Sequence, residues 1–445
     1  MKRIIITGIA AIMLFSRIDA QNNQKLWTLE ECISYAYENN INLKQREQDE
    51  ESAKIDLRTG QSSWLPNLNA SLGQNMGFGR TTSREGIIVD KNSTTSSFNM
   101  QTSMSLFNGF KITNDIAARK LNLMAATESL NKAKEDLAIN VTSYYLTALY
   151  NKELVYIAEL HVNFTREQVK RTEALLEEGK VPVSQLSNIN AQLAKDELTF
   201  TEARNNASLA LLDLAQVLEL ERFGTAFDIV MPEVKDVMAD NMQSIISPED
   251  IYANAVAFKP QIKEQEFLLE SRKKSLRMAQ ADYYPRLSLS ANYSNGYYRF
   301  GENDVAFNDQ LKQNAQKGVS VSLSIPIFNR FVYNNNVRKV RIGIANQELS
   351  LENSKKMLYK EIQQAYFTAV AAQAKYVASE KSVIASKEAF DYAEESYAVG
   401  KSSVFEYNES KMKYAASLLE QAQAKYTLIF RAKILDFYNG IEIRL

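Results

Sequence analysis

The chain contains the same pattern twice, and this internal repeat limits its possible folds more than any other feature. Gly179 separates two long helical patterns, and Gly400 separates two similar ones 221 residues later (400 − 179). The segment that begins at Phe107 recurs at Phe328, again 221 residues later. Glycine is a common residue in the turn that ends a helix. The repeat therefore predicts two similar halves, each with one hairpin of long helices.

Residues that interrupt secondary structure are rare. Gly (15) and Pro (7) form about 5% of the 445 residues, whereas average usage is about 12%. Apart from Gly109 itself, the segments 109–178 and 330–399 contain a single glycine, Gly343. Each is therefore expected to form one helix of roughly 105 Å at 1.5 Å per residue. Apolar residues recur every seven positions, which indicates helices that lie along other helices. These seams are Leu123, Leu130, Leu137, Tyr144, Val141, Ala148 and Val155 in the first segment, and Ile344, Leu351, Leu358, Ala365, Ile362, Ala369, Tyr376 and Val383 in the second.

Four further segments alternate between apolar and small polar residues, which is the pattern of strands. Each is about ten to twelve residues long, with one apolar face and one face of mostly Ser, Asn and Gln. Strands of membrane barrels have this pattern, because one face meets lipid and the other meets water. The segments begin at Leu68, Phe98, Leu287 and Val319, and loops are expected at 81–97 and 301–317.

Four strands are too few to close a barrel, since about eight are needed. An open sheet edge would leave unpaired backbone groups in lipid, where no water can satisfy them. Other chains must therefore complete the barrel, and three copies would supply about twelve strands around a water-filled lumen. The expected fold is mainly α with a membrane β part. It is internally duplicated, with long helical hairpins that form a tunnel and four strands per protomer in a trimeric twelve-stranded barrel.

Residues 1–20 have the pattern of a secretory signal peptide. Lys2 and Arg3 precede an apolar run from Ile4 to Phe15, and a cleavage site is plausible before Gln21. No later stretch reaches eighteen consecutive apolar residues. The exported chain is therefore expected to cross a membrane only as a barrel.

Composition and motifs exclude several classes of function. The net charge of −1 gives no indication of nucleic-acid binding. One Cys and one His exclude a disulfide framework and a zinc site built from His and Cys. Cys32 is expected to be a small apolar contact, and His161 to be solvated on a helix. No phosphate-binding loop, nucleophile motif or metal motif occurs, which predicts a protein that is not an enzyme and uses no cofactor or metal.

The remaining segments complete the two halves. Thr28 and Glu31 form an expected capping box at the start of a helical region, 28–60. The connector between the halves lacks periodicity, and 227–232 is a candidate strand within it. The expected parts are a signal peptide (1–20), first-repeat N-terminal helices (21–65), a first barrel strand pair (66–108), a first long helical hairpin (109–220), an equatorial connector (221–246), second-repeat N-terminal helices (247–284), a second barrel strand pair (285–329), and a second long hairpin with the C-terminus (330–445).

This layout resembles the TolC family of outer-membrane channels. The resemblance covers essentially the whole mature chain and rests on the duplication, on the order of strand pair and long helix, and on the tip sequence from Tyr397 to Ser402. It implies a homotrimer in the outer membrane of a Gram-negative cell, in contact with outer-membrane lipid, with a periplasmic tunnel and an equatorial belt. It also implies docking, through a periplasmic adaptor, to an inner-membrane pump.

The resemblance further indicates candidate sites near the hairpin tips. In the family, carboxylates six and nine positions past the tip glycine form rings at the tunnel entrance, and here Glu406 and Glu409 occupy those positions. They share a helix face, although such residues are also ordinary on a solvated helix. The residues that match the family's adaptor-docking tips are Gly179, Lys180, Val181, Val399, Gly400 and Lys401. Each glycine also suits a plain helix C-cap.

The most consistent function is a passive exit duct of a tripartite efflux or type I secretion system. The alternative is an exported coiled-coil structural or adhesive protein of the cell envelope. That alternative explains the heptads and the signal peptide. It does not explain four alternating strands at matching points of the two halves.

Overall fold

The computed structural model describes residues 26–82, 86–220, 227–231, 247–300 and 305–445. The expected signal peptide and most of the connector lie outside these residues. The chain is mostly helical, at 71%, as expected. It divides into two compact units. One, here called the sheet unit, comprises 45–132 and 257–357, and the other, the hairpin unit, comprises 1–44, 133–256 and 358–445.

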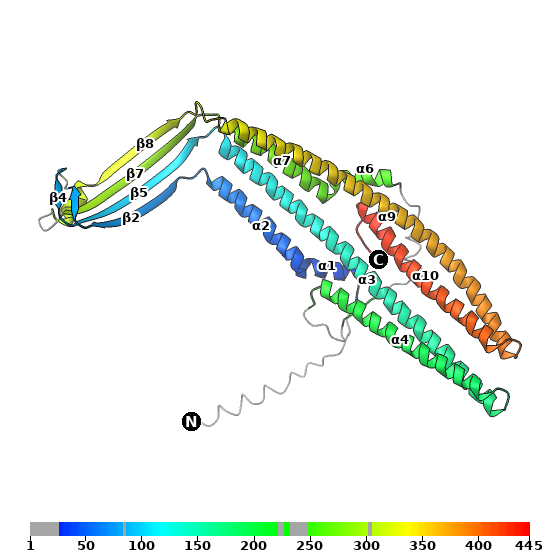
Figure 1. Cartoon of the computed structure of the whole chain (residues 1–445). Coiled ribbons are helices and arrows are strands. Elements are labelled where there is room, and N and C mark those ends of the chain that lie inside the picture. The colour runs from blue at the N-terminus through cyan, green and yellow to red at the C-terminus, as the bar shows by residue number, and fades with distance from the viewer. Residues whose placement is uncertain (1–25, 83–85, 221–226, 232–246, 301–304) are drawn as a thin grey trace, which may run out of the picture. The chain divides into compact units, whose positions relative to one another are not determined.

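The sheet unit contains a four-stranded antiparallel sheet with the strand order β2-β5-β7-β8 (Figure 1). The strands are β2 (Asn67–Gly77), β5 (Ser93–Phe107), β7 (Arg286–Phe300) and β8 (Gln316–Ser324). The four strands predicted from the alternating pattern are therefore confirmed, and two of them are longer than expected.

The connections at the far end of the sheet contain elements that the sequence did not predict. β3 (Arg80–Thr82) and β4 (Ile88–Asp90) form a short hairpin, and β5 already begins at Ser93. The expectation of a loop throughout 81–97 was therefore wrong. Its Thr residues suit strands, because they are β-branched. The connection between β7 and β8 contains a short helix, α8 (Phe307–Gln313).

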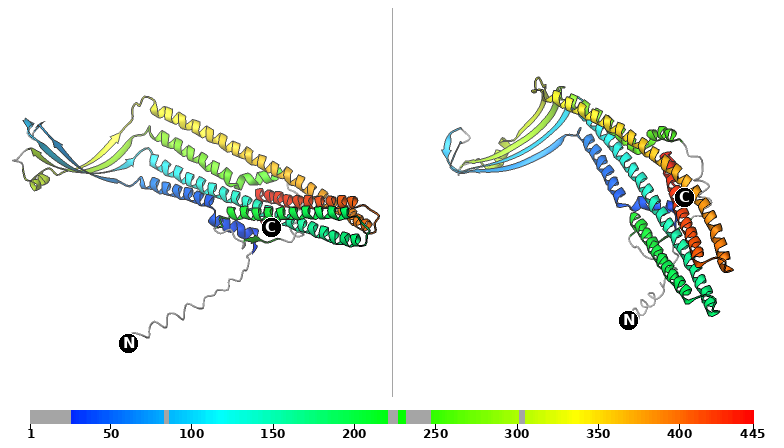
Figure 2. Two further views of the ribbon diagram at one scale, coloured as in Figure 1. Left: turned by 60° about the horizontal axis from the view of Figure 1, so that its bottom comes forward. Right: turned by 45° about the vertical axis from the view of Figure 1, so that its right-hand side comes forward.

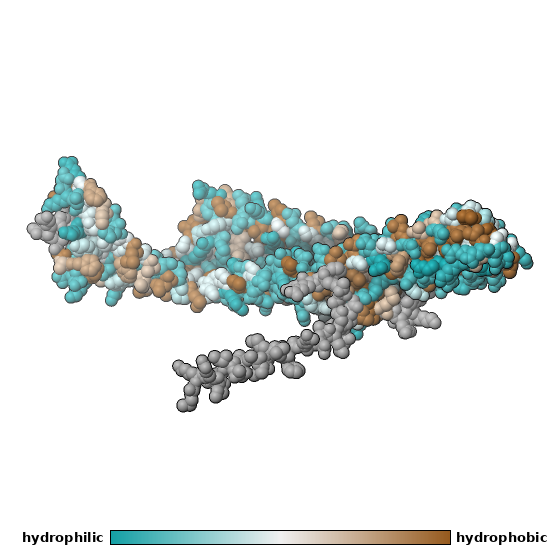
Figure 3. Space-filling view, turned by 90° about the horizontal axis from the view of Figure 1, so that it is seen from below, coloured by the Kyte–Doolittle hydropathy of each residue, from teal (hydrophilic) through white to brown (hydrophobic). Residues whose placement is uncertain are grey.

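The two faces of the sheet differ in polarity. Residues directly opposite each other in antiparallel strands share a face, and the register places apolar residues opposite one another. Such pairs are Ala70 with Met100, Leu72 with Phe98, Met104 with Leu289, and Leu287 with Leu323. The other face carries rows such as Asn69–Gln101–Asn292 and Ser103–Ser290–Ser320. Apolar residues are exposed on the sheet surface (Figure 3), and Leu72 is 82% and Val319 77% exposed in the single chain.

Four helical segments of the sheet unit lie side by side in one layer (Figures 1 and 2). They are α2 (Ile41–Ser62), the first part of α3 (Lys111–Glu177), α7 (Pro260–Ala281) and the first part of α9 (Val332–Ala398). Their order is that of the strands to which they connect. Within the described residues, no helix combines the length and the apolar character needed to cross a bilayer.

The passage from β5 into α3 requires a glycine. Gly109 has a φ of +66°, and a Cβ at this position would lie 2.8 Å from the carbonyl oxygen of Ala281 and 2.9 Å from Cβ of Tyr284. The close approach of the end of α7 therefore excludes a side chain at this position, and the left-handed backbone disfavours one. At the corresponding point before α9, Arg330 and Phe331 have φ values of +54° and +62°.

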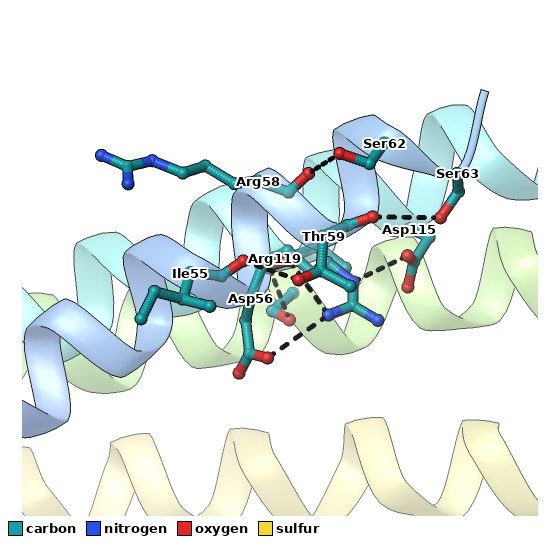
Figure 4. Close-up of polar contacts among 10 residues, drawn as sticks. Ile55, Asp56, Arg58, Thr59, Ser62, Ser63, Asp115 and Arg119 are labelled. Carbon is teal, nitrogen blue, oxygen red and sulfur yellow. Dashed lines mark hydrogen bonds and ion pairs between the residues drawn. The ribbon is translucent and has the colours of Figure 1, made fainter. Parts of the chain in front are cut away.

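Arg119 of α3 ties α3 to α2 (Figure 4). Its Nε donates to Asp115 Oδ2 at 2.7 Å, and its Nη1 donates to the backbone oxygen of Asp56 at 3.1 Å. Gly60 makes room for this contact, because a Cβ there would lie 2.6 Å from Cδ of Arg119. The three charged side chains line a cavity of about 490 Å³ between α2, α3 and α7.

The hairpin unit contains the rest of two helical hairpins, α3 with α4 (Val183–Val217) and α9 with α10 (Val404–Tyr438). The expected heptad seams form much of its core, although Tyr144 stays 39% exposed. Buried seam residues here are Leu137, Val141, Ala148, Leu358, Ile362, Ala365 and Ala369. The unit also holds α6 (Pro248–Phe258) and the parallel pair of β1 (Leu26–Trp27) with β6 (Asp228–Ile229). β6 lies within the candidate strand at 227–232.

The helical region 28–60 consists of two helices. The first, α1 (Leu29–Asn39), begins with the expected capping box of Thr28 and Glu31. Asn40 interrupts the helix with a ψ of 126°. Its side chain accepts a hydrogen bond from the backbone N–H of Leu43 and donates one to the carbonyl of Val217, both at 3.2 Å. Asn40 thus caps α2, and nothing in the apolar pattern signals this.

Candidate functional site at the hairpin tips

Both hairpins turn through the same backbone motif. In the first, the N–H of Lys180 donates to the carbonyl of Leu175 and the N–H of Gly179 to that of Leu176, both at 2.9 Å. This is the Schellman pattern, which needs a left-handed residue. Gly179 has a φ of +70° and Gly400 one of +73°. A Cβ at either glycine would meet nothing within 4 Å, so only the backbone conformation requires glycine.

The tips are open to solvent in the single chain. Lys180 and Lys401 are exposed, and Val181 is half-buried. Lys180 forms an ion pair with Glu178 at 2.5 Å. Val399 is 69% exposed. Apolar and cationic groups are therefore both accessible on the second tip.

Glu406 and Glu409 lie on the exposed side of α10, close to the tip. Glu406 also has a local role, because it forms a capping box with Ser403, in which its carboxylate accepts from the N–H of Ser403 at 2.8 Å. The Ser-x-x-Glu spacing is a readable sequence signal for this box. Glu409 forms an exposed ion pair with Lys413 at 2.7 Å.

The two hairpins touch each other at their tips. Arg171 of α3 donates to the backbone oxygen of Ala398 at 3.1 Å, and Gln185 of α4 donates to the hydroxyl of Tyr397 at 3.0 Å. Tyr397 also stacks on Tyr407, with ring centroids 5.2 Å apart. Burial and the nearby Glu394 raise the pKa of Tyr407 to about 12, so its hydroxyl stays neutral at physiological pH.

A buried polar cluster joins the hairpins farther from the tips. Lys411 of α10 extends between α3 and α4, where it donates to Thr165 and, at 3.1 Å, to Asp196. Asp196 also accepts from Gln192 at 2.6 Å. The side chains of Lys411 and Asp196 are only 6% and 13% exposed. Burial lowers the pKa of Lys411, while Asp196 opposes this shift.

His161 belongs to the surroundings of this cluster, so the expectation of a solvated histidine was wrong. Its Nε2 is buried and has no hydrogen-bond partner in the described part of the chain. Burial lowers its pKa, and the positive charge of Lys411 acts in the same direction. The neutral ring is therefore the favoured form. Cys32, by contrast, is fully buried as expected.

A second buried lysine repeats this arrangement. Lys425 stands fourteen residues after Lys411 on the same helix, and it pairs with Glu153 of α3. Its side chain is 8% exposed. Sequence reasoning missed both lysines, because a charged residue on a long helix is usually solvated. No group of three or more His, Cys, Asp or Glu side chains suited to a metal comes together among the described residues.

Comparisons with known proteins bear on the family and the fold of the chain. A family described as "Outer membrane efflux protein" matches residues 32–219 and 251–435. The outer membrane efflux protein BepC of Brucella suis is 19% identical over 422 residues, covering 94% of this chain and 87% of BepC. The outer membrane protein TolC of Escherichia coli (strain K12) is 21% identical over 405 residues, covering 88% and 77%. A crystal structure of CusC superposes with a TM-score of 0.77 and 18% identity, covering 93% and 92%, so the fold is shared. The family match extends over most of the chain, and the chain belongs to the outer membrane efflux protein family.

Proposed function

We propose that three copies of this chain form one closed channel, which is the passive exit duct of a tripartite system. Members of the family are outer-membrane efflux channels, and this chain is one of them. The sheet is the observation that best supports a trimer. Its strands β2 and β8 each have one neighbour in the described sheet, and its faces are segregated into apolar and polar.

The geometry of barrels supports three copies. Four strands cannot curve into a closed cylinder, whereas about twelve enclose an aqueous lumen. Strand β8 of one copy would pair with β2 of the next, so no backbone group would remain unpaired in lipid. The polar rows, such as Ser103–Ser290–Ser320, would line the lumen, and the apolar rows would face lipid. The duplicated halves and the part boundaries expected from the sequence belong to this proposal.

The helical hairpins would form the periplasmic part of the duct, and their tips would meet the adaptor. Supporting features are the exposed Val399, Gly400 and Lys401 on the second tip, together with Gly179, Lys180 and Val181 on the first. An inner-membrane pump would supply the energy through that adaptor. The channel itself would perform no catalysis, since it needs only a continuous water-filled path.

Glu406 and Glu409 would form a ring of six carboxylates at the tunnel entrance. Both are exposed on one helix near the second tip, and the ring would favour cations. Changing both to Gln tests this without disturbing the fold, because Gln also serves in a capping box. Cation selectivity in planar bilayers should fall, while Glu420→Gln, farther along α10, should leave it unchanged. Equal selectivity in the unchanged protein, the double variant and Glu420→Gln would show that Glu406 and Glu409 do not line the entrance.

The trimer is tested by the mass and conductance of the mature protein in detergent. We expect three times the monomer mass and ohmic pores. Val321→Pro places a residue without an N–H in β8, at the edge that a second copy would pair with. This variant should lose both properties, and Val321→Ala should retain them. A monomer without conductance in the unchanged protein would contradict the proposal.

A further inference from the structure

Helix α8 is held against the end of β7 that β8 does not reach. β8 pairs with residues 286–294 of β7, although β7 continues to Phe300. Beyond that point the Gln310 side chain donates to the backbone oxygen of Tyr298 at 2.9 Å and accepts from its N–H at 3.0 Å. Asn314 donates to the backbone oxygen of Gly296 at 2.7 Å. These amides replace a missing strand, so the position of α8 is fixed.

A cavity of about 570 Å³ lies between α8 and the sheet. Pockets for small ligands have volumes of about 300–1,000 Å³, so the cavity is large enough for part of a ligand. Leu72, Phe98 and Tyr293 form its wall on the apolar face of the sheet, and Phe307 and Leu311 form its wall on α8. The lining is therefore mainly apolar and aromatic.

Two lysines, Lys312 and Lys317, are neighbours of the lining residues Leu311 and Tyr293. Lys317 is directly opposite Tyr293 in the sheet, so it shares the apolar face. It continues the row of Leu323, Val321 and Val319 at the end far from the helices. Both Lys317 and Lys312 of α8 are exposed. Neither forms an ion pair with any residue that the structure describes. A lysine at the end of a lipid-facing row extends its amine toward the lipid headgroups.

The place of the cavity in the barrel indicates which lipids can reach it. In the proposed barrel, the helices lie in the periplasm, so the connection that contains α8 lies at the outer surface of the cell. The cavity opens on the face that meets lipid. A ligand at this position needs an apolar chain for the cavity and negative charge for the lysines.

We propose that this cavity binds an anionic lipid of the outer leaflet, with an acyl chain between α8 and the sheet and a phosphate at Lys317 and Lys312. The proposal rests on the barrel described under Proposed function. Asp309, the one carboxylate on α8, would be the unfavourable neighbour of that phosphate. A lipid held here would fill the space beside the short strand β8 and seal the rim of the barrel.

The test is a titration of the delipidated detergent-solubilised channel with diphosphorylated lipid A, read out by native mass spectrometry. Replacing both Lys312 and Lys317 with Gln should weaken binding at least tenfold. Leu311→Trp, which fills the cavity and keeps the charges, should weaken it similarly. Lys91→Gln is the matched control, because Lys91 is exposed in the connection between β4 and β5 at the same end of the sheet. It should bind like the unchanged protein.

Conductance is measured on the same samples, so that a failure of the lipid site can be distinguished from a failure of the proposed function. If all variants form conducting trimers and bind lipid A equally, or if zwitterionic phosphatidylethanolamine binds as tightly as lipid A, the lipid site is refuted while the channel stands. If the unchanged protein forms no conducting trimer, the proposed function itself is refuted.

Discussion

Replacing Lys411 with Met should loosen the contact between the two hairpins. The change keeps most of the side-chain volume but leaves Asp196 buried without its cation, since these side chains are only 6% and 13% exposed. Removing one partner of a buried ion pair destabilises a protein by about 3–5 kcal/mol. Thr165 and Gln192 would still donate to the carboxylate, so the lower part of that range is expected.

Hydrogen exchange of the detergent-solubilised protein measures this effect locally. Since about 1.4 kcal/mol corresponds to a factor of ten, amides of α10 around residue 411 should exchange two to three orders of magnitude faster in the variant. Lys413→Met is the matched control, because that side chain is 70% exposed and its ion pair with Glu409 contributes less than about 1 kcal/mol. Exchange in the control should change by less than about fivefold.

A double variant tests the reason for the effect. Lys411→Met combined with Asp196→Leu removes both charges, and buried pairs replaced by apolar residues are often neutral or stabilising. Exchange should therefore return close to that of the unchanged protein. If Lys411→Met behaves like Lys413→Met, or if the double variant exchanges as fast as the single one, the ion pair does not hold the hairpins together.

Three further predictions concern other described contacts. Because the folded state lowers the pKa of His161, the unfolded chain binds its proton first, so stability should decrease as pH falls below about 6.5. His161→Gln should reduce this decrease, which melting curves between about pH 7.5 and 5 would reveal. Gly60→Val should displace Arg119 and cost about 1–3 kcal/mol, measured as a lower melting temperature. Gly343→Ala, which meets open space, should be neutral or slightly stabilising, and equal effects of the two would contradict the role of Gly60. Tyr397→Phe removes the hydrogen bond between the hairpin tips, worth about 1 kcal/mol. Amides around residue 397 should then exchange about fivefold faster, and unchanged exchange would show that this bond does not hold the tips together.

Short-range patterns explain how much of the fold was predictable. The alternation from Leu68 onward and the heptads beginning at Leu123 reflect which face of each element is covered, and this information lies within a few residues. The capping box at Thr28 was readable for the same reason. The break at Asn40 combines a local cap, in which Asn40 accepts from the N–H of Leu43, with a bond to a carbonyl 177 residues away. Only the second of these lies beyond a local pattern.

The contacts between hairpins were not predictable in this way. Lys411 and Asp196 lie on different helices, and each alone has the appearance of a solvated charge. Only their arrangement around Thr165 shows that the pair is buried. His161 was misjudged for the same reason, because its polar neighbours in sequence are not its neighbours in space.

The segregated faces of the sheet have a consequence for assembly and for evolution. Strand β8 presents Ser320 and Ser322 to one side and Val319 and Val321 to the other. In the proposed barrel, a neighbouring copy that slipped by one residue along this edge would bring the wrong face into contact with lipid. Slips are thus restricted to even steps of about 7 Å, two residues of an extended strand. Insertions and deletions within these strands should likewise be tolerated only in even numbers of residues, because an odd number would exchange the two faces.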